Sequence, residues 1–354
     1  YTTLFRSNPP NVIKSNLFHQ IYIKAALALT LTSGAFLGVL ILSQISIAKA
    51  FQFERYALTQ AHGHVQIFGW VGLFIMGMST YLIPEISGKE LKKPKLILTS
   101  FLLMFFGIVG RLIGQACANS SFFSIIPFIS SLGEFAAIGI FCFVLLSAWN
   151  FKRFVFSDLY LLSAFVYLVI LAVLNLVQGY QITMIRSGVI GQPANDIFLH
   201  LVVMGFVSSM IMGVTLKIRN SGPRSQKWLL AVFIVFNLGI WLKVFGLQKG
   251  GESVFYQWVE LTGSACEAVA GLMFVSLLQF FHPVKFQQSI EPISNRFIFL
   301  AYFWFCAALL MEFFGTLYSV LSGSAPAHIY VGAYRHAITV GFITKMIMRS
   351  EEQT

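Results

Sequence analysis

The chain has 354 residues, of which 57% are hydrophobic and only 10% are charged. A water-soluble protein of this length needs far more charged side chains to cover its surface, so a lipid bilayer must be the solvent for most of the chain. A net charge of +11 can indicate nucleic-acid binding. Here the charges sort by membrane side, so we expect no nucleic-acid partner.

Ten segments are long and apolar enough to cross a bilayer, which takes about 20 mainly apolar residues. The connections between them carry Pro, Gly, Asn and Lys, which are typical of loops. The predicted spans lie near residues 21–48, 60–84, 96–118, 125–150, 158–180, 195–218, 228–248, 256–281, 296–321 and 327–349. The sequence therefore predicts one all-α integral membrane domain over residues 1–354, with membrane lipid as its surroundings.

Lys and Arg residues outside the spans predict the orientation of the chain. Seventeen fall on one face of the membrane, and only Lys49, Arg55, Arg186 and Lys249 fall on the other. Basic loops stay in the cytoplasm, so both termini are expected inside, in the cytoplasmic (inner) membrane of the cell.

A motif of the form His-x4-Gly-[Phe/Trp]-x4-Ile-Met occurs three times without gaps. The copies begin at His64, His200 and His336, which are 136 residues apart both times. They fall on the second, sixth and tenth predicted spans, so the repeat unit is four helices. The units cover approximately 21–150, 158–281 and 296–349, and the third is incomplete. A pseudo-threefold arrangement is therefore predicted.

Other polar residues echo the same repeat within the spans. The matched pairs are Arg111 with Lys243, Glu134 with Glu267, and Asn175 with Glu312. Counted along their helices at 1.5 Å per residue, the first two pairs reach a depth similar to that of the histidines. We expect one polar layer in the outer third of the bundle.

Ionisable residues at membrane depth are costly and mark functional sites by default. Two imidazoles at matching depth on facing helices can ligate a heme iron, and the Gly five residues after each His gives a flat ring room to approach. Arg111, Lys243 and Arg335 would then contact the heme propionates. Two simpler interpretations stay open: the histidines as hydrogen-bonded helix contacts, and Arg111 with Glu134 as a buried ion pair.

The residues around the first motif resemble a known family. His62-Gly-His64-Val-Gln-Ile-Phe68-Gly69-Trp70, continuing to Gly77, Pro84 and Gly88, resembles the signature of the NnrS family. Gly110-Arg111 and the segment from His336 to Gly341 also look like motifs of that family. NnrS-like proteins bind heme and copper in the membrane and act in the cellular handling of nitric oxide.

A wider resemblance is to the catalytic subunit of heme–copper oxidases and nitric oxide reductases. That likeness implies a heme b held by His62 or His64 together with His336, while His200 would serve a second heme or a copper ion. The oxidase copper site also needs paired histidines on the seventh span, and this chain has none there. Oxygen reduction is therefore not expected, and whether the chain is an enzyme stays open.

The sequence thus predicts an NnrS-like, heme-b-binding membrane protein for nitric oxide handling or electron transfer. One alternative is a cytochrome b-type subunit that exchanges electrons with quinone inside a larger redox complex. The other is a proton- or anion-coupled transporter without a cofactor. Transporter repeats are often inverted, whereas these repeats share one orientation.

Overall fold

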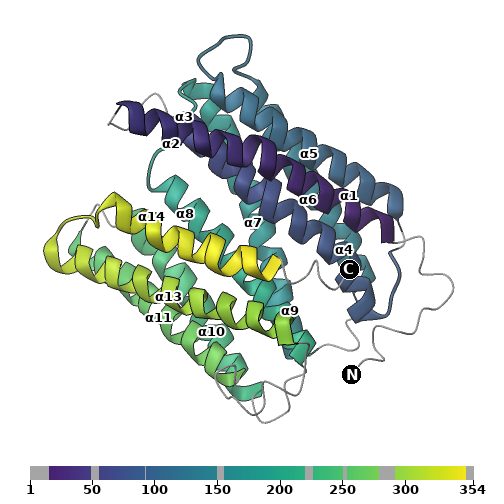
Figure 1. The fold of residues 1–354 in the computed structure, drawn as a ribbon, viewed down its shortest axis with the longest axis vertical. Helices are drawn as coiled ribbons and strands as arrows, with labels where there is room; N and C mark the ends of the chain where they lie inside the picture. Colours follow the sequence, from purple (N-terminus) through teal and green to yellow (C-terminus); the bar gives the residue numbers. More distant parts are fainter. Residues whose placement is uncertain are drawn as a thin grey trace. The chain divides into compact units, whose positions relative to one another are not determined.

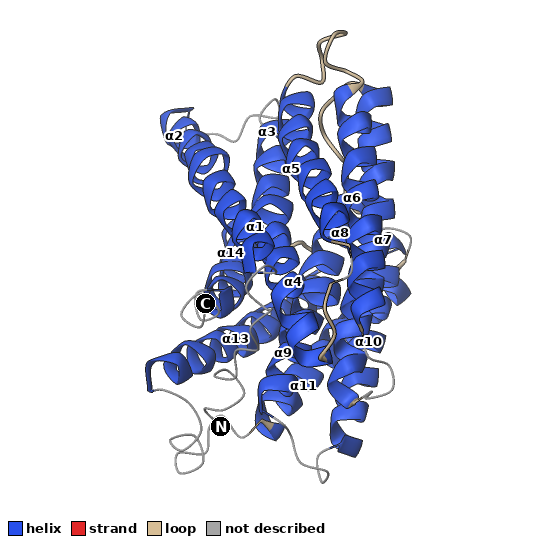
Figure 2. Cartoon of the chain, turned by 90° about the vertical axis from the view of Figure 1, so that its right-hand side faces the viewer, coloured by secondary structure: helices blue, strands red, loops and turns tan. Residues whose placement is uncertain are grey.

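The computed structural model of the chain describes residues 16–48, 56–91, 93–149, 155–219, 226–249, 253–278 and 292–347. Within these ranges every regular element is a helix and no strand occurs (Figure 2). Nine of the described helices are long and apolar enough to cross a membrane. The chain is therefore an all-α, multi-pass membrane protein.

The tenth predicted span also forms a helix, but a more polar one. It comprises α14 (His328–His336) and η8 (Ala337–Thr344) and includes Arg335, His336 and Lys345. These charged and polar side chains explain why it is not among the nine apolar helices of the described chain. Whether it crosses the membrane stays a prediction.

The chain divides into two compact units. Unit 1 contains residues 1–154 and 169–190, and unit 2 contains residues 155–168 and 191–354. Helix α7 (Phe156–Ile185) contributes its first part to unit 2 and the remainder to unit 1. The predicted boundaries of the repeat units differ from this division, and the predicted threefold arrangement is not tested by it.

Unit 1 is built from long helices that pack in pairs. Helix α1 packs on α4, and α5 lies beside α6 (Figure 1). A Cβ atom at Gly77 would lie 2.7 Å from Cβ of Tyr22, so this glycine allows α4 to approach α1 closely. Besides its part of α7, unit 1 contains α1 (Asn16–Leu29), η2 (Thr30–Ala35), α2 (Phe36–Ala48), α3 (Tyr56–His64), η4 (Val65–Gly72), α4 (Leu73–Ser87), α5 (Pro94–Ala116) and α6 (Ile126–Ala148).

Unit 2 uses the same kind of packing. Helix α10 lies beside α11, and α13 packs on both α11 and η8. The Tyr302 hydroxyl donates to Thr215 Oγ1 over 2.8 Å, which ties α13 to α9. Besides α14, η8 and its part of α7, unit 2 contains α8 (Ala194–His200), η6 (Leu201–Ser208), α9 (Ser209–Arg219), α10 (Gln226–Lys249), α11 (Val254–Leu277) and α13 (Pro292–Ser322).

A π-helical stretch follows each of the three motif histidines. The stretches η4, η6 and η8 are each eight residues long and begin directly after His64, His200 and His336. Wide π-helical turns are rare in proteins and are concentrated at functional sites. This shared local geometry supports treating the three segments as related.

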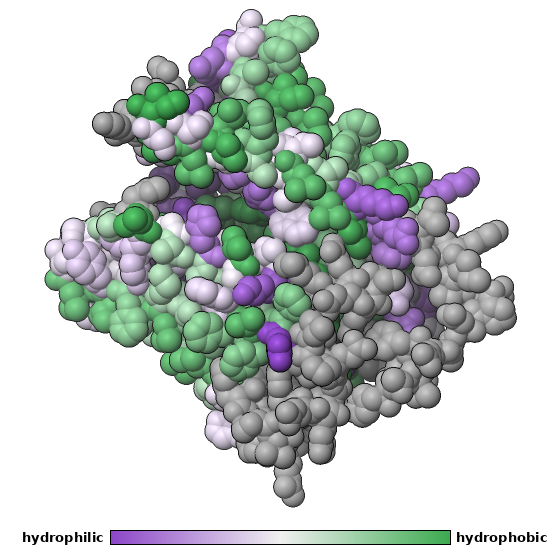
Figure 3. Space-filling model, in the orientation of Figure 1, coloured by the Kyte–Doolittle hydropathy of each residue, from purple (hydrophilic) through white to green (hydrophobic). Residues whose placement is uncertain are grey.

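The outer faces of the helices are apolar. Large exposed side chains include Leu31, Leu42, Phe106, Val166 and Phe314. Figure 3 shows hydrophobic side chains over much of the visible face. These faces suit contact with lipid, whereas His64, Glu134, His200 and Glu267 are buried inside the units.

Candidate functional site

Each unit contains a buried histidine next to a buried glutamate. The unit 1 cluster is made of His64, Arg111, Ser131, Glu134 and Asn175. The unit 2 cluster is made of His200, Lys243, Ser264, Glu267 and Glu312. The sequence predicted that most of these residues share one depth, and the structure shows that they form a separate cluster within each unit.

In unit 1, Glu134 is the centre of a hydrogen-bonded group. Its Oε1 lies 3.0 Å from His64 Nε2, and its Oε2 accepts from the side-chain amide of Asn175. His64 also stacks on Phe68, with ring centroids 4.9 Å apart. Both oxygens of this buried carboxylate therefore have donors, and His64 is held by Glu134 on one side and Phe68 on the other.

Arg111 is one of the largest fully buried side chains, with 1% of its surface exposed. It donates from Nη1 to Ser131 Oγ over 2.6 Å and from Nε to Gln115 Oε1 over 3.2 Å. Gln115 in turn donates to the carbonyl of Gly188 over 2.8 Å. The hydrogen bonds of the guanidinium thus go to Ser131 and Gln115, and the interpretation of Arg111 with Glu134 as a buried ion pair stays a prediction.

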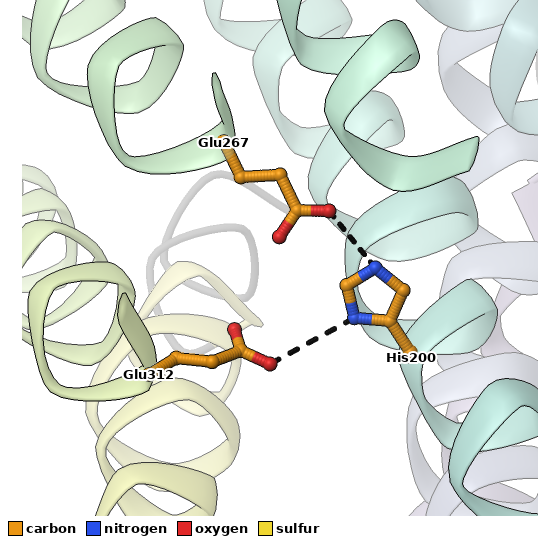
Figure 4. Close-up of side chains that lie close together, drawn as sticks. All are labelled: His200, Glu267 and Glu312. Carbon is orange, nitrogen blue, oxygen red and sulfur yellow. Dashed lines mark ion pairs between the residues drawn. The ribbon is translucent and has the colours of Figure 1, made fainter. Parts of the chain in front are cut away.

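In unit 2, His200 lies between two carboxylates (Figure 4). Its Nε2 lies 2.9 Å from Glu267 Oε1, and its Nδ1 lies 3.9 Å from Glu312 Oε1. Figure 4 shows the two glutamates approaching the ring from different helices, α11 and α13. One ligand atom from each of the three residues lies within 4.8 Å of the other two.

Lys243 holds the second of these glutamates in place. Its ammonium group contacts Glu312 Oε1 and lies 3.1 Å from Ser264 Oγ. Only 4% of the lysine is exposed, so burial of its charge is compensated by that carboxylate. Lys243 therefore takes the place in unit 2 that Arg111 has in unit 1.

Glycines bring the cation-bearing helix close to the glutamate in both units. A Cβ atom at Gly107 on α5 would lie 2.6 Å from Glu134 Cγ, and one at Gly239 on α10 would lie 2.9 Å from Glu267 Cγ. No side chain larger than hydrogen fits there without displacement. The two clusters therefore share a common local construction.

The two neighbouring histidines of α3 point in different directions, as expected for residues two apart on a helix. A Cβ atom at Gly38 on α2 would lie 3.3 Å from His62 Cε1, so the His62 ring lies against that glycine. The buried Nδ1 of His62 has no hydrogen-bond partner among the described residues. His64 instead faces Glu134 on α6.

His336 and Arg335 lie at the end of α14 in unit 2. Nδ1 of the exposed His336 lies 2.7 Å from the carbonyl oxygen of Gly332. Arg335 Nη2 donates to Asp196 Oδ1 over 3.0 Å, with 42% of the arginine side chain exposed. His62 and His64 belong to unit 1 and His336 to unit 2, so their predicted pairing around one heme stays a prediction.

Several contacts of the clusters were not foreseen from the sequence. These include the serines that bind Arg111 and Lys243, the role of Gln115, and the partner of Arg335, Asp196. The spacing of the serines held a usable signal: Ser131 precedes Glu134 by three residues, as Ser264 precedes Glu267. Residues three apart share a helix face.

Comparison of the chain with protein-family models and with curated proteins finds no match.

Proposed function

We propose that this chain is a heme-b-binding, NnrS-like protein of the cytoplasmic membrane that handles nitric oxide or passes electrons. His336 would be one axial ligand and His62 or His64 the other. Quinone or other redox subunits would be its partners in the electron-transfer form of this proposal. The basic loops would face the cytoplasm, as their distribution along the chain indicates.

The observation that carries the proposal is the hydrogen bond of the exposed His336 ring. A histidine that donates from Nδ1 to a backbone carbonyl keeps the lone pair of Nε2 for a metal. His336 has this bond, to Gly332, and its ring is exposed. His336 could therefore bind iron through Nε2 while it keeps this hydrogen bond.

The second iron ligand would be either His64 or His62, and the two differ in their hydrogen bonds. His64 would have to give up Glu134, its partner at 3.0 Å, before Nε2 could bind iron. His62 has a ring nitrogen without a hydrogen-bond partner in the described part of the chain. Within the pair that the sequence left open, His62 is therefore the better candidate, and His64 the candidate to hold a proton with Glu134.

The two predicted propionate contacts, Arg111 and Arg335, differ in their partners and in their exposure. Arg111 is committed to Ser131 and Gln115 inside unit 1, whereas Arg335 is partly exposed. An exposed pair such as Arg335 with Asp196 contributes at most about 1 kcal/mol and exchanges easily for another anion. Arg335 is therefore the better propionate contact of the two.

Pyridine hemochrome analysis of the purified, heme-loaded chain tests this proposal. We expect b-type heme in the native protein and loss of most of it in H336A, with G139A, where an added Cβ meets no atom within 4 Å, as the control that keeps it. Folded native protein that retains no heme under these conditions would refute the proposal.

A second function is favoured by the two clusters themselves. Buried His–Glu pairs at membrane depth are typical of proton pathways, so proton-coupled transport without a cofactor is the alternative. Proteoliposomes containing a pH-sensitive dye would then show proton flux that E134Q slows. A native protein that binds heme and shows no proton flux would rule out this alternative and support the heme proposal.

A further inference from the structure

Glu267 is a buried carboxylate without a hydrogen-bond donor. Only 1% of the residue is exposed, and neither of its oxygens has a hydrogen-bond partner among the described residues. Burying an ionised group in this way costs several kcal/mol unless something compensates it. A carboxylate that is buried at such cost beside other ligating atoms is a candidate ligand for a cation.

The contact of Glu267 with His200 is an ion pair when His200 is protonated, but it does not have the geometry of a hydrogen bond. His200 Nε2 lies 2.9 Å from Glu267 Oε1, yet the two atoms are not aligned for an N–H···O bond. The matching pair of unit 1, His64 with Glu134, is separated by 3.0 Å and is hydrogen-bonded. At nearly equal distances, only the unit 1 pair has the geometry of a hydrogen bond, which leaves the oxygens of Glu267 without a donor among the described residues.

Glu312 completes a set of three ligands. Its carboxylate, Glu267 and His200 come from three helices, and one ligand atom from each falls within 4.8 Å of the others. Ligands bind a zinc-sized ion at about 2.0–2.2 Å, so the ligand atoms of a tetrahedral site lie about 3.3–3.6 Å apart. His200 and Glu267 are already this close, and side-chain shifts of about 1 Å bring the carboxylate of Glu312 to the same ion.

The balance of charge also favours a cation in unit 2. The unit 2 cluster contains two carboxylates, Glu267 and Glu312, and one lysine, whereas the unit 1 cluster contains one carboxylate and one arginine. The difference comes from Asn175, which takes the position of Glu312. Lys243 contacts one oxygen of Glu312 and leaves the second oxygen of that carboxylate available for an ion.

We infer that His200, Glu267 and Glu312 form a binding site for a divalent first-row transition-metal ion, separate from the proposed heme. One imidazole and two carboxylates suit Mn²⁺, Fe²⁺ or Zn²⁺ better than Ca²⁺ or Mg²⁺, which prefer oxygen ligands alone. Lys243 is a positioning residue that orients Glu312. Unit 1 has the same construction but lacks the third ligand and the excess negative charge.

Titration of Co²⁺ into the full chain, purified in detergent and stripped with a chelator, tests this inference. Bound cobalt is counted by elemental analysis after equilibrium dialysis, which distinguishes it from heme iron. We expect about one Co²⁺ per chain, displaced by Zn²⁺, and binding that is weakened about 10–100-fold or more in E267Q and in E312N. The matched control is E134Q, which changes the equivalent glutamate of unit 1 and is expected to bind Co²⁺ as the native chain does.

Two outcomes would overturn the inference. One is folded native protein that binds no Co²⁺. The other is equal loss of Co²⁺ binding in E134Q and E267Q. Because E312N introduces the residue that unit 1 carries naturally, it provides a second variant if E267Q does not fold.

Discussion

Glu134 and Glu267 occupy matching places in two units, but only Glu134 is hydrogen-bonded on both oxygens. Glu134 accepts from a histidine and an asparagine and lies near an arginine. Glu267 has a histidine beside it that is not aligned as a donor. The same residue type is therefore a structural element in one unit and a candidate ligand in the other.

The first prediction compares the stability of E134Q and E267Q in the absence of metal. E134Q weakens the two hydrogen bonds that Glu134 accepts, so we expect a loss of about 1–3 kcal/mol. Glu267 accepts no hydrogen bond among the described residues, so E267Q should lose less stability than E134Q. Thermal unfolding in detergent measures both. A lower midpoint for E267Q than for E134Q would contradict this contrast.

The second prediction concerns the buried arginine. R111M removes the hydrogen bonds of the guanidinium to Ser131 and Gln115 and should cost about 1–3 kcal/mol. The double variant R111M/E134Q removes both charges and should recover part of that loss. A double-mutant cycle from thermal unfolding measures the coupling. Simple additivity of the two single changes would show that Arg111 and Glu134 do not interact.

The third prediction concerns the close approach of α5 and α6. G107A places a Cβ atom 2.6 Å from Glu134 Cγ, so we expect overpacking that costs about 1–3 kcal/mol. Gly139 on α6 has no atom within 4 Å of an added Cβ. G139A is the matched control and should be neutral or stabilising by about 1 kcal/mol, because alanine favours a helix. Equal midpoints for the two variants would refute the packing account.

The fourth prediction separates two roles of Arg335. R335Q and D196N both break the partly exposed pair and should each change stability by less than about 1 kcal/mol. Only R335Q removes a propionate contact, so only R335Q should speed the loss of heme to a scavenger such as apomyoglobin. Equal rates of loss in both variants would assign Arg335 to the ion pair alone.

Helical architecture was predictable from the sequence because membrane spans are long and uniformly apolar. The matching of Arg111 with Lys243 and of Glu134 with Glu267 also followed from spacing, since residues at one depth on neighbouring helices can meet. Side-chain direction was not predictable. The sequence left His62 and His64 open as iron ligands; in the structure Nε2 of His64 faces Glu134, and Arg111 is bound to Ser131 and Gln115. These choices depend on rotamers and on helix rotation, which span patterns do not define.

The most direct test of the proposed function is low-temperature electron paramagnetic resonance of the oxidised, heme-loaded chain. Two histidine ligands give a low-spin iron signal, and we expect this signal in the native protein. In H336A, one ligand is lost and the iron should become high-spin. A native protein with high-spin iron, or a low-spin signal that H336A leaves unchanged, would contradict the assignment of His336 as an axial ligand.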